Sequence, residues 1–63
     1  MKILNTYRIC DLRIDQTLTR FGTEEWFLVD EGAPDDELGL KPVIAQGTRE
    51  QVAARVQQEM SRA

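Results

Sequence analysis

Carboxylates are the side chains of this sequence whose spacing most resembles a catalytic pattern. They stand as adjacent pairs at Glu24/Glu25 and Asp35/Asp36. Paired carboxylates work as general acid and base when a cleft shifts their pKa values. A chain of 63 residues has too little interior to enclose such a cleft easily, and adjacent acids are common on exposed loops. We therefore expect no acid–base catalysis from these pairs.

Nucleophilic, metal and phosphate chemistry are equally poorly supplied. The sequence has no histidine and one cysteine, Cys10, so a nucleophile would lack its usual base and Cys/His zinc sites are excluded. The segment from Asp30 to Asp36 lacks the alternating ligands and central glycine of an EF-hand, and the four glycines are scattered singly. We predict a protein that is not an enzyme and has no cofactor or metal, with Cys10 as a small buried side chain in a strand.

Length and thiol content also bear on location and domain organisation. The chain fits one small domain, residues 1–63, with a thin core. A lone thiol is typical of a reducing compartment. The start turns polar at Lys2 and Asn5, and no apolar run approaches the length that spans a bilayer. We expect a cytoplasmic, soluble protein without membrane contact.

The charges are segregated along the chain. The net charge is −3, yet the acids cluster in one segment without any cation. The members of this segment are Glu24, Glu25, Asp30, Glu31, Asp35, Asp36 and Glu37. A wide acidic loop over residues 30–40 is either a solvated loop that aids solubility or a patch that docks on a basic protein surface.

Hydrophobic patterning predicts three strands and one helix that position these residues. The strands are expected at 7–14, 25–30 and 41–46, where apolar, aromatic and β-branched residues gather between turn signals. Residues 15–24 stay ambiguous between more strand and one helical turn. A helix is predicted over 48–61, because Thr48 and Gln51 have the capping-box spacing. The predicted class is α+β, with a three-stranded antiparallel sheet and one C-terminal helix packed on one face.

Both faces of that sheet are expected to carry large side chains. Alternation puts Trp26 and Leu28 on one face and Phe27 on the other, and separates Tyr7 from Ile14. One helix covers one face, so the second is predicted to be a binding face. Two alternatives stay open: residues 15–24 fold over that face as a lid, or a free edge strand or the bare face joins two copies into a homodimer.

In size, charge and lack of catalytic residues the chain resembles the small acidic proteins of phages and mobile elements that bind and disable a host protein, anti-CRISPR proteins among them. The resemblance implies a protein-interaction module that acts as an inhibitor. The acidic loop predicts a partner with a basic surface. Single-stranded nucleic acid is disfavoured, because the acidic segment flanks the aromatic strand. The predicted partner-binding residues are Tyr7, Trp26, Leu28, Asp30, Glu31, Asp35, Asp36 and Glu37.

Overall fold

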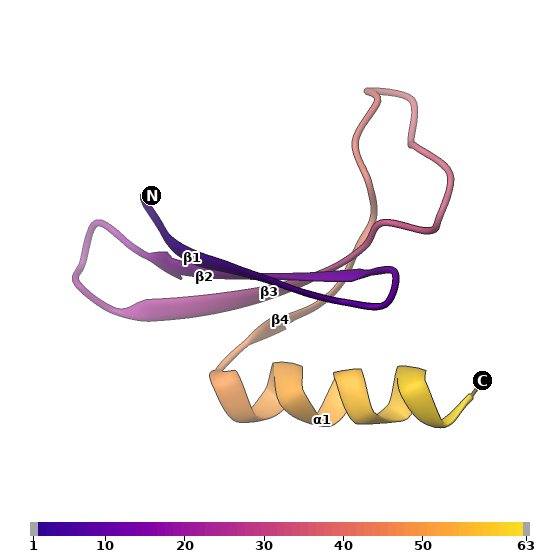
Figure 1. The fold of residues 1–63 in the computed structure, drawn as a ribbon. Coiled ribbons are helices and arrows are strands. Elements are labelled where there is room, and N and C mark those ends of the chain that lie inside the picture. Colours follow the sequence, from indigo (N-terminus) through magenta and orange to yellow (C-terminus); the bar gives the residue numbers. More distant parts are fainter. Residues whose placement is uncertain (1, 63) are drawn as a thin grey trace.

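The protein forms a four-stranded antiparallel sheet with one helix on one face. The computed structural model describes residues 2–62. The strands are β1 (Lys2–Ile9), β2 (Leu12–Leu18), β3 (Glu24–Asp30) and β4 (Val43–Gly47), and they lie in chain order across the sheet; the helix is α1 (Arg49–Ser61). Figure 1 shows α1 beneath the sheet and the long β3–β4 loop rising above it. The α+β class, the antiparallel sheet and the C-terminal helix are thus confirmed.

The predicted number of strands was wrong, because the expected strand 7–14 is two strands joined by a tight turn. Ile9 pairs with Leu12, so only Cys10 and Asp11 lie between β1 and β2. Cys10 has a φ of 51°, the left-handed conformation that short hairpin turns require and that glycine and asparagine usually supply. Its side chain is exposed, so the prediction of a buried Cys10 was also wrong.

Residues 15–24 do not form a lid over the sheet. Asp15 to Leu18 belong to β2, residues 19–23 form the turn, and Glu24 begins β3. The hydroxyl of Thr19 accepts hydrogen bonds from the backbone N–H groups of Phe21 and Thr23 and closes this turn. Phe21 lies at the tip of this turn and is 79% exposed, so it covers neither face of the sheet.

The helix begins as its sequence predicts. Thr48 is the N-cap: its hydroxyl accepts from the Gln51 N–H, and the Gln51 side chain accepts from the Thr48 N–H. Gly47 precedes the cap with a φ of 139°, a conformation that favours glycine. The chain can therefore turn directly from β4 into α1, which fixes the helix against β3 and β4.

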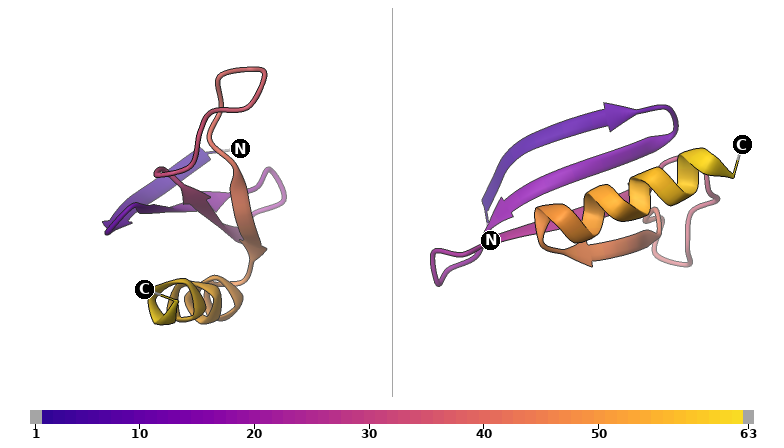
Figure 2. Two further views of the ribbon diagram at one scale, coloured as in Figure 1. Left: turned by 90° about the vertical axis from the view of Figure 1, so that its right-hand side faces the viewer. Right: turned by 90° about the horizontal axis from the view of Figure 1, so that it is seen from below.

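The core lies between α1 and the middle of the sheet. Leu12, Leu28 and Val52 form its buried centre, and partly buried apolar side chains surround it. Leu28 has no exposed surface and Val52 only 1%. α1 contacts β3 and β4, and the core reaches Leu12 on β2, so edge strand β1 is the strand that the core leaves uncovered. Figure 2 shows the β1–β2 hairpin extending beyond the helix.

Candidate functional site

The β1–β2 turn determines which side chains point to the sheet face on the side of α1. Residues paired directly across neighbouring strands point to the same face. Tyr7 pairs with Ile14, Ile14 with Leu28, and Leu28 with Ala45, so one apolar row crosses the whole sheet on the side of α1. The prediction that Tyr7 and Ile14 lie on opposite faces of the sheet was therefore wrong, because the missed turn reverses the alternation between them.

An open groove lies where this apolar row extends beyond the helix towards β1. It has a volume of about 930 Å³, and an apolar extension of about 460 Å³ continues along the helix towards its C-terminal end. The floor comes from Tyr7, Ile9 and Ile14, and Trp26 lies beside the start of α1. The groove therefore lies between the β1–β2 hairpin and α1.

Aromatic stacking organises the floor of this groove. The rings of Tyr7 and Trp26 stack across β2, with centroids 6.2 Å apart and planes inclined by 13°. Trp26 also packs against the core, whereas Tyr7 remains 47% exposed. The stack presents a rigid aromatic surface, the kind of surface that dominates binding energy at protein interfaces.

Edge strand β1 is exposed along its entire length. Ile3 is 60% exposed and Ile9 37%, although Ile9 faces the groove. An uncovered edge strand with exposed apolar side chains on a small domain is typical of an interaction site. Sequence reasoning missed Ile9 and Ile14 as site residues because their common face follows only from the turn at Cys10.

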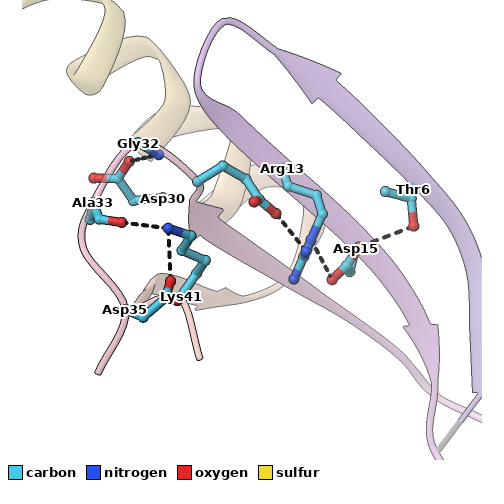
Figure 3. Close-up of polar contacts among 9 residues, drawn as sticks. Thr6, Arg13, Asp15, Asp30, Gly32, Ala33, Asp35 and Lys41 are labelled. Atoms are coloured by element: carbon cyan, nitrogen blue, oxygen red, sulfur yellow. Dashed lines mark hydrogen bonds and ion pairs between the residues drawn. The ribbon is translucent and has the colours of Figure 1, made fainter. Parts of the chain in front are cut away.

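The opposite sheet face is polar around β2 (Figure 3). Arg13 forms ion pairs with Asp15, at 3.3 Å, and with Glu31. Asp15 also accepts a hydrogen bond from the hydroxyl of Thr6 on β1. These contacts fasten the start of the β3–β4 loop to the sheet and leave the face suited to water, so the expectation of a second large apolar binding face does not apply to this half of the sheet.

Most of the predicted acidic residues have internal structural partners. The Asp30 carboxylate accepts from the Gly32 N–H, and Asp35 pairs with Lys41 at 2.8 Å. Lys41 also donates to the carbonyl of Ala33, and its hydrogen bond to Asp35 raises the pKa of Lys41 above its ordinary value. The loop is therefore held by its own charges.

The tip of the same loop is built on a single carboxylate. Asp36 accepts from the N–H groups of Leu38 and Leu40, and Glu37 is exposed beside them. Leu38 is 82% exposed and Leu40 59%. These two leucines add an apolar tip that sequence reasoning did not single out, since an isolated leucine in a loop carries no periodic signal.

The structure does not bring the predicted site residues together. Tyr7 and Trp26 line the groove on the side of α1, whereas the acidic loop rises from the other side of the sheet (Figure 1). Leu28 lies in the core with no surface for a partner. The structure therefore divides the predicted surface into an aromatic groove and a separate acidic loop.

Comparisons with protein-family models, curated proteins and solved structures found no match. Within residues 2–62, no helix is long and apolar enough to cross a membrane, and no group of three or more acidic or cysteine side chains is placed to hold a metal ion. The groove and its lining residues are therefore the basis for a functional proposal.

Proposed function

We propose that the protein is a non-enzymatic interaction module that binds a partner protein through the groove between α1 and the β1–β2 hairpin. The observation that carries the proposal is the uncovered edge strand β1, where Tyr7 and Ile9 stay exposed beside the stacked Trp26. Burying apolar surface of this kind on a partner is favourable by roughly 25 cal/mol per Å² before the costs of association. We propose further that it acts in the cytoplasm as an inhibitor of the kind that phages encode.

The acidic loop has a secondary role in this proposal. Its carboxylates are largely engaged within the loop, and it lies across the sheet from the groove. Charges that lie outside the contact surface speed the diffusional encounter of the two proteins more than they add affinity. A partner with a basic surface therefore fits the loop, while the groove supplies the stable contact.

Matched lysine substitutions on the two sides test the assignment. Ile9→Lys puts a charge in the groove, and Leu38→Lys puts the same charge on the loop tip. With the wild-type chain as bait in a cell lysate, we expect Ile9→Lys to abolish capture of the bound protein and Leu38→Lys to retain it. Capture that survives Ile9→Lys in a folded variant, or that is lost only with Leu38→Lys, contradicts the proposal.

A homodimer is the second candidate, favoured by the exposure of all eight residues of β1. An edge strand offers unpaired backbone groups to a second copy. Light scattering between micromolar and hundred-micromolar concentrations separates the two candidates. A mass near 7.2 kDa with quencher-accessible Trp26 fluorescence supports the free groove, and a stable dimer with shielded Trp26 supports self-association.

A further inference from the structure

The outer side of strand β1 carries backbone groups that pair with no other strand. β1 lies at the end of the sheet and pairs with β2 along one side. On the other side of an edge strand, alternate residues direct their N–H and C=O groups away from the sheet. All eight residues of β1 are exposed. Among protein segments, an extended strand is the one that pairs with such a row of alternating donors and acceptors.

The regular part of this edge has the length of one short strand. The register of β1 on β2 is continuous from Asn5 to Ile9 and shifts only before Asn5. The five residues of this stretch span about 17 Å at about 3.3 Å each, which matches a typical strand. At the other edge of the sheet, β4 begins after Pro42, which has no N–H, and Arg55 donates to one of its carbonyls. β1 is therefore the edge open to a partner.

The side chains of β1 alternate between two different surroundings. Tyr7 is paired with Ile14, which packs against the core on the side of α1. Ile9 lies two residues further along β1 and points the same way. Tyr7 is 47% exposed and Ile9 37%, whereas Arg8 between them points to the opposite face. Directly paired residues share a face, so a strand added to β1 would place two side chains beside Tyr7 and Ile9 and the one between them beside Arg8.

Arg8 specifies the charge of that middle side chain. It is paired with Arg13 on β2, and like charges directly opposite each other on neighbouring strands are unfavourable. Arg13 forms ion pairs with Asp15 and Glu31, whereas Arg8 forms none with any residue in the described range 2–62. An acid on the outer side of Arg8 would therefore offset the repulsion between the two arginines.

The acids near this face lie on the inner side of β1, away from its free edge. Asp15 on β2 accepts a hydrogen bond from Thr6, and Glu31 reaches Arg13 from the β3–β4 loop. Asp11, in the β1–β2 turn, lies against the start of the same loop. β1 itself carries cations and no acid. A carboxylate that a partner brings to the outer side of β1 therefore meets a cation there without a competing acid.

A second copy of this chain does not supply that carboxylate through β1. Its own β1 has the same side chains, so two paired edges would bring only cations together. Charged edges of this kind disfavour pairing between identical strands. They remain open to a strand of opposite charge, because specificity depends on repelling the wrong partner as well as attracting the right one. The expected occupant is therefore a strand of another protein.

We propose that β1 binds an extended acidic segment of a partner protein, which joins the sheet as one further strand. A glutamate or aspartate of this segment lies beside Arg8, and the apolar residues before and after it pack beside Tyr7 and Ile9. This inference rests on the proposed function. It names the secondary structure, the charge and the side-chain pattern of the partner at the open border of the groove.

Synthetic peptides of about seven residues test the proposal. The first alternates valine with glutamate, and the second alternates valine with lysine. Two further forms of the first carry N-methyl groups, either on the valines or on the glutamates, so that each loses the N–H donors along one side of the strand only. Hydrogen exchange of the β1 amides in the wild-type protein, followed by NMR, is the readout.

The acidic peptide should bind and slow the exchange of alternate β1 amides, and the basic peptide should bind more weakly. One N-methyl form should bind and the other should not, because only one side of an added strand pairs with β1.

Variants of the chain locate the acidic residue. Arg8→Glu should weaken binding of the acidic peptide by about two- to five-fold and strengthen binding of the basic one, as expected for one exposed charge pair. Arg20→Glu is the matched control, because it makes the same change of charge in the turn between β2 and β3, beyond the other end of β2. It should leave both affinities nearly unchanged. Equal effects of the two variants contradict the pairing with Arg8.

The outcomes separate this inference from the proposed function. If the two N-methyl forms bind alike, the peptide does not join the sheet and the inference is wrong. A concentration-dependent dimer that protects the β1 amides and excludes the peptides identifies a second copy as the occupant and also overturns it. If no peptide binds while capture from lysate still depends on Ile9, the added strand is refuted and the interaction module stands.

Discussion

The turn at Cys10 offers the sharpest test of the fold, because the hairpin and hence the groove depend on it. Cys10 holds a φ of 51°, a conformation in which the β-carbon of an L-residue crowds the following carbonyl oxygen. Glycine has no β-carbon and adopts this conformation without that cost. We therefore expect Cys10→Gly to raise the stability of the protein.

The magnitude follows from two opposing contributions. Left-handed backbone costs an L-residue roughly 1–2 kcal/mol, and glycine loses about 0.5–1 kcal/mol more conformational entropy on folding than alanine does. The exposed side chain of Cys10 contributes little packing. The expected gain is about 0.5–1 kcal/mol, which in a domain of this size raises Tm by roughly 2–8 °C.

Thermal unfolding followed by circular dichroism, with reductant present, measures this effect. Cys10→Ser is the matched control, because serine removes the thiol and keeps the β-carbon, and its Tm should stay near that of the wild type. A Tm of Cys10→Gly at or below that of Cys10→Ser would show that residue 10 carries no left-handed strain. The assigned turn, and the common face of the β1 and β2 side chains, would then be wrong.

Three further perturbations address the helix, the loop and the core. Thr48→Ala and Gln51→Ala each remove half of the capping box and should lower the free energy of unfolding by about 1 kcal/mol, with a double mutant less than additive because the bonds are reciprocal. The hydrogen bond to Asp35 raises the pKa of Lys41 above 10.5. The Lys41–Asp35 pair therefore stabilises the fold fully below pH 10.5, and this stabilisation is lost as the pH rises through the raised pKa. From neutral to alkaline pH, the denaturant midpoint should fall less for Lys41→Met than for wild type. Leu28→Ala removes a side chain without exposed surface at a cost of about 2–5 kcal/mol, comparable to the whole stability of a domain this small, so its NMR spectrum should lose the dispersion of a folded chain.

The elements best predicted from sequence are those with a local chemical signal. Thr48 and Gln51 form the capping box that their spacing indicates. The apolar run beginning at Trp26 predicts strand 25–30, which the structure extends by one residue to Glu24. In both places the interactions that fix the element lie within a few residues of each other, so the sequence alone contains them.

The first hairpin could not be predicted because its turn lacks the residues that usually make one. Cys10 and Asp11 replace the asparagine and glycine that mark a two-residue turn. The apolar residues around them read as one strand from 7 to 14. Pairing between β1 and β2 over most of their length outweighs the local strain at Cys10, and such nonlocal pairing leaves no trace in a window of a few residues.

The binding site was only partly predicted, because the direction of the acidic loop is not encoded locally. Tyr7 and Trp26 were expected in a binding surface, and both line the groove. The acidic loop was expected beside them, but the loop leaves β3 towards the opposite side of the sheet (Figure 1). The direction of a long loop depends on contacts such as Arg13 with Glu31, which join residues distant in sequence.

Self-association through β1 would not remove the groove. Two β1 strands paired antiparallel are related by a twofold axis perpendicular to the sheet, so both helices would lie on the same face. Two features of β1 disfavour pairing with an identical strand: the register shift between Ile3 and Asn5, and the cations Lys2 and Arg8. The other edge begins after Pro42, and Arg55 donates to the Ile44 carbonyl of β4. In a monomer or an edge-paired dimer alike, Tyr7 and Ile9 therefore stay exposed on the side of α1.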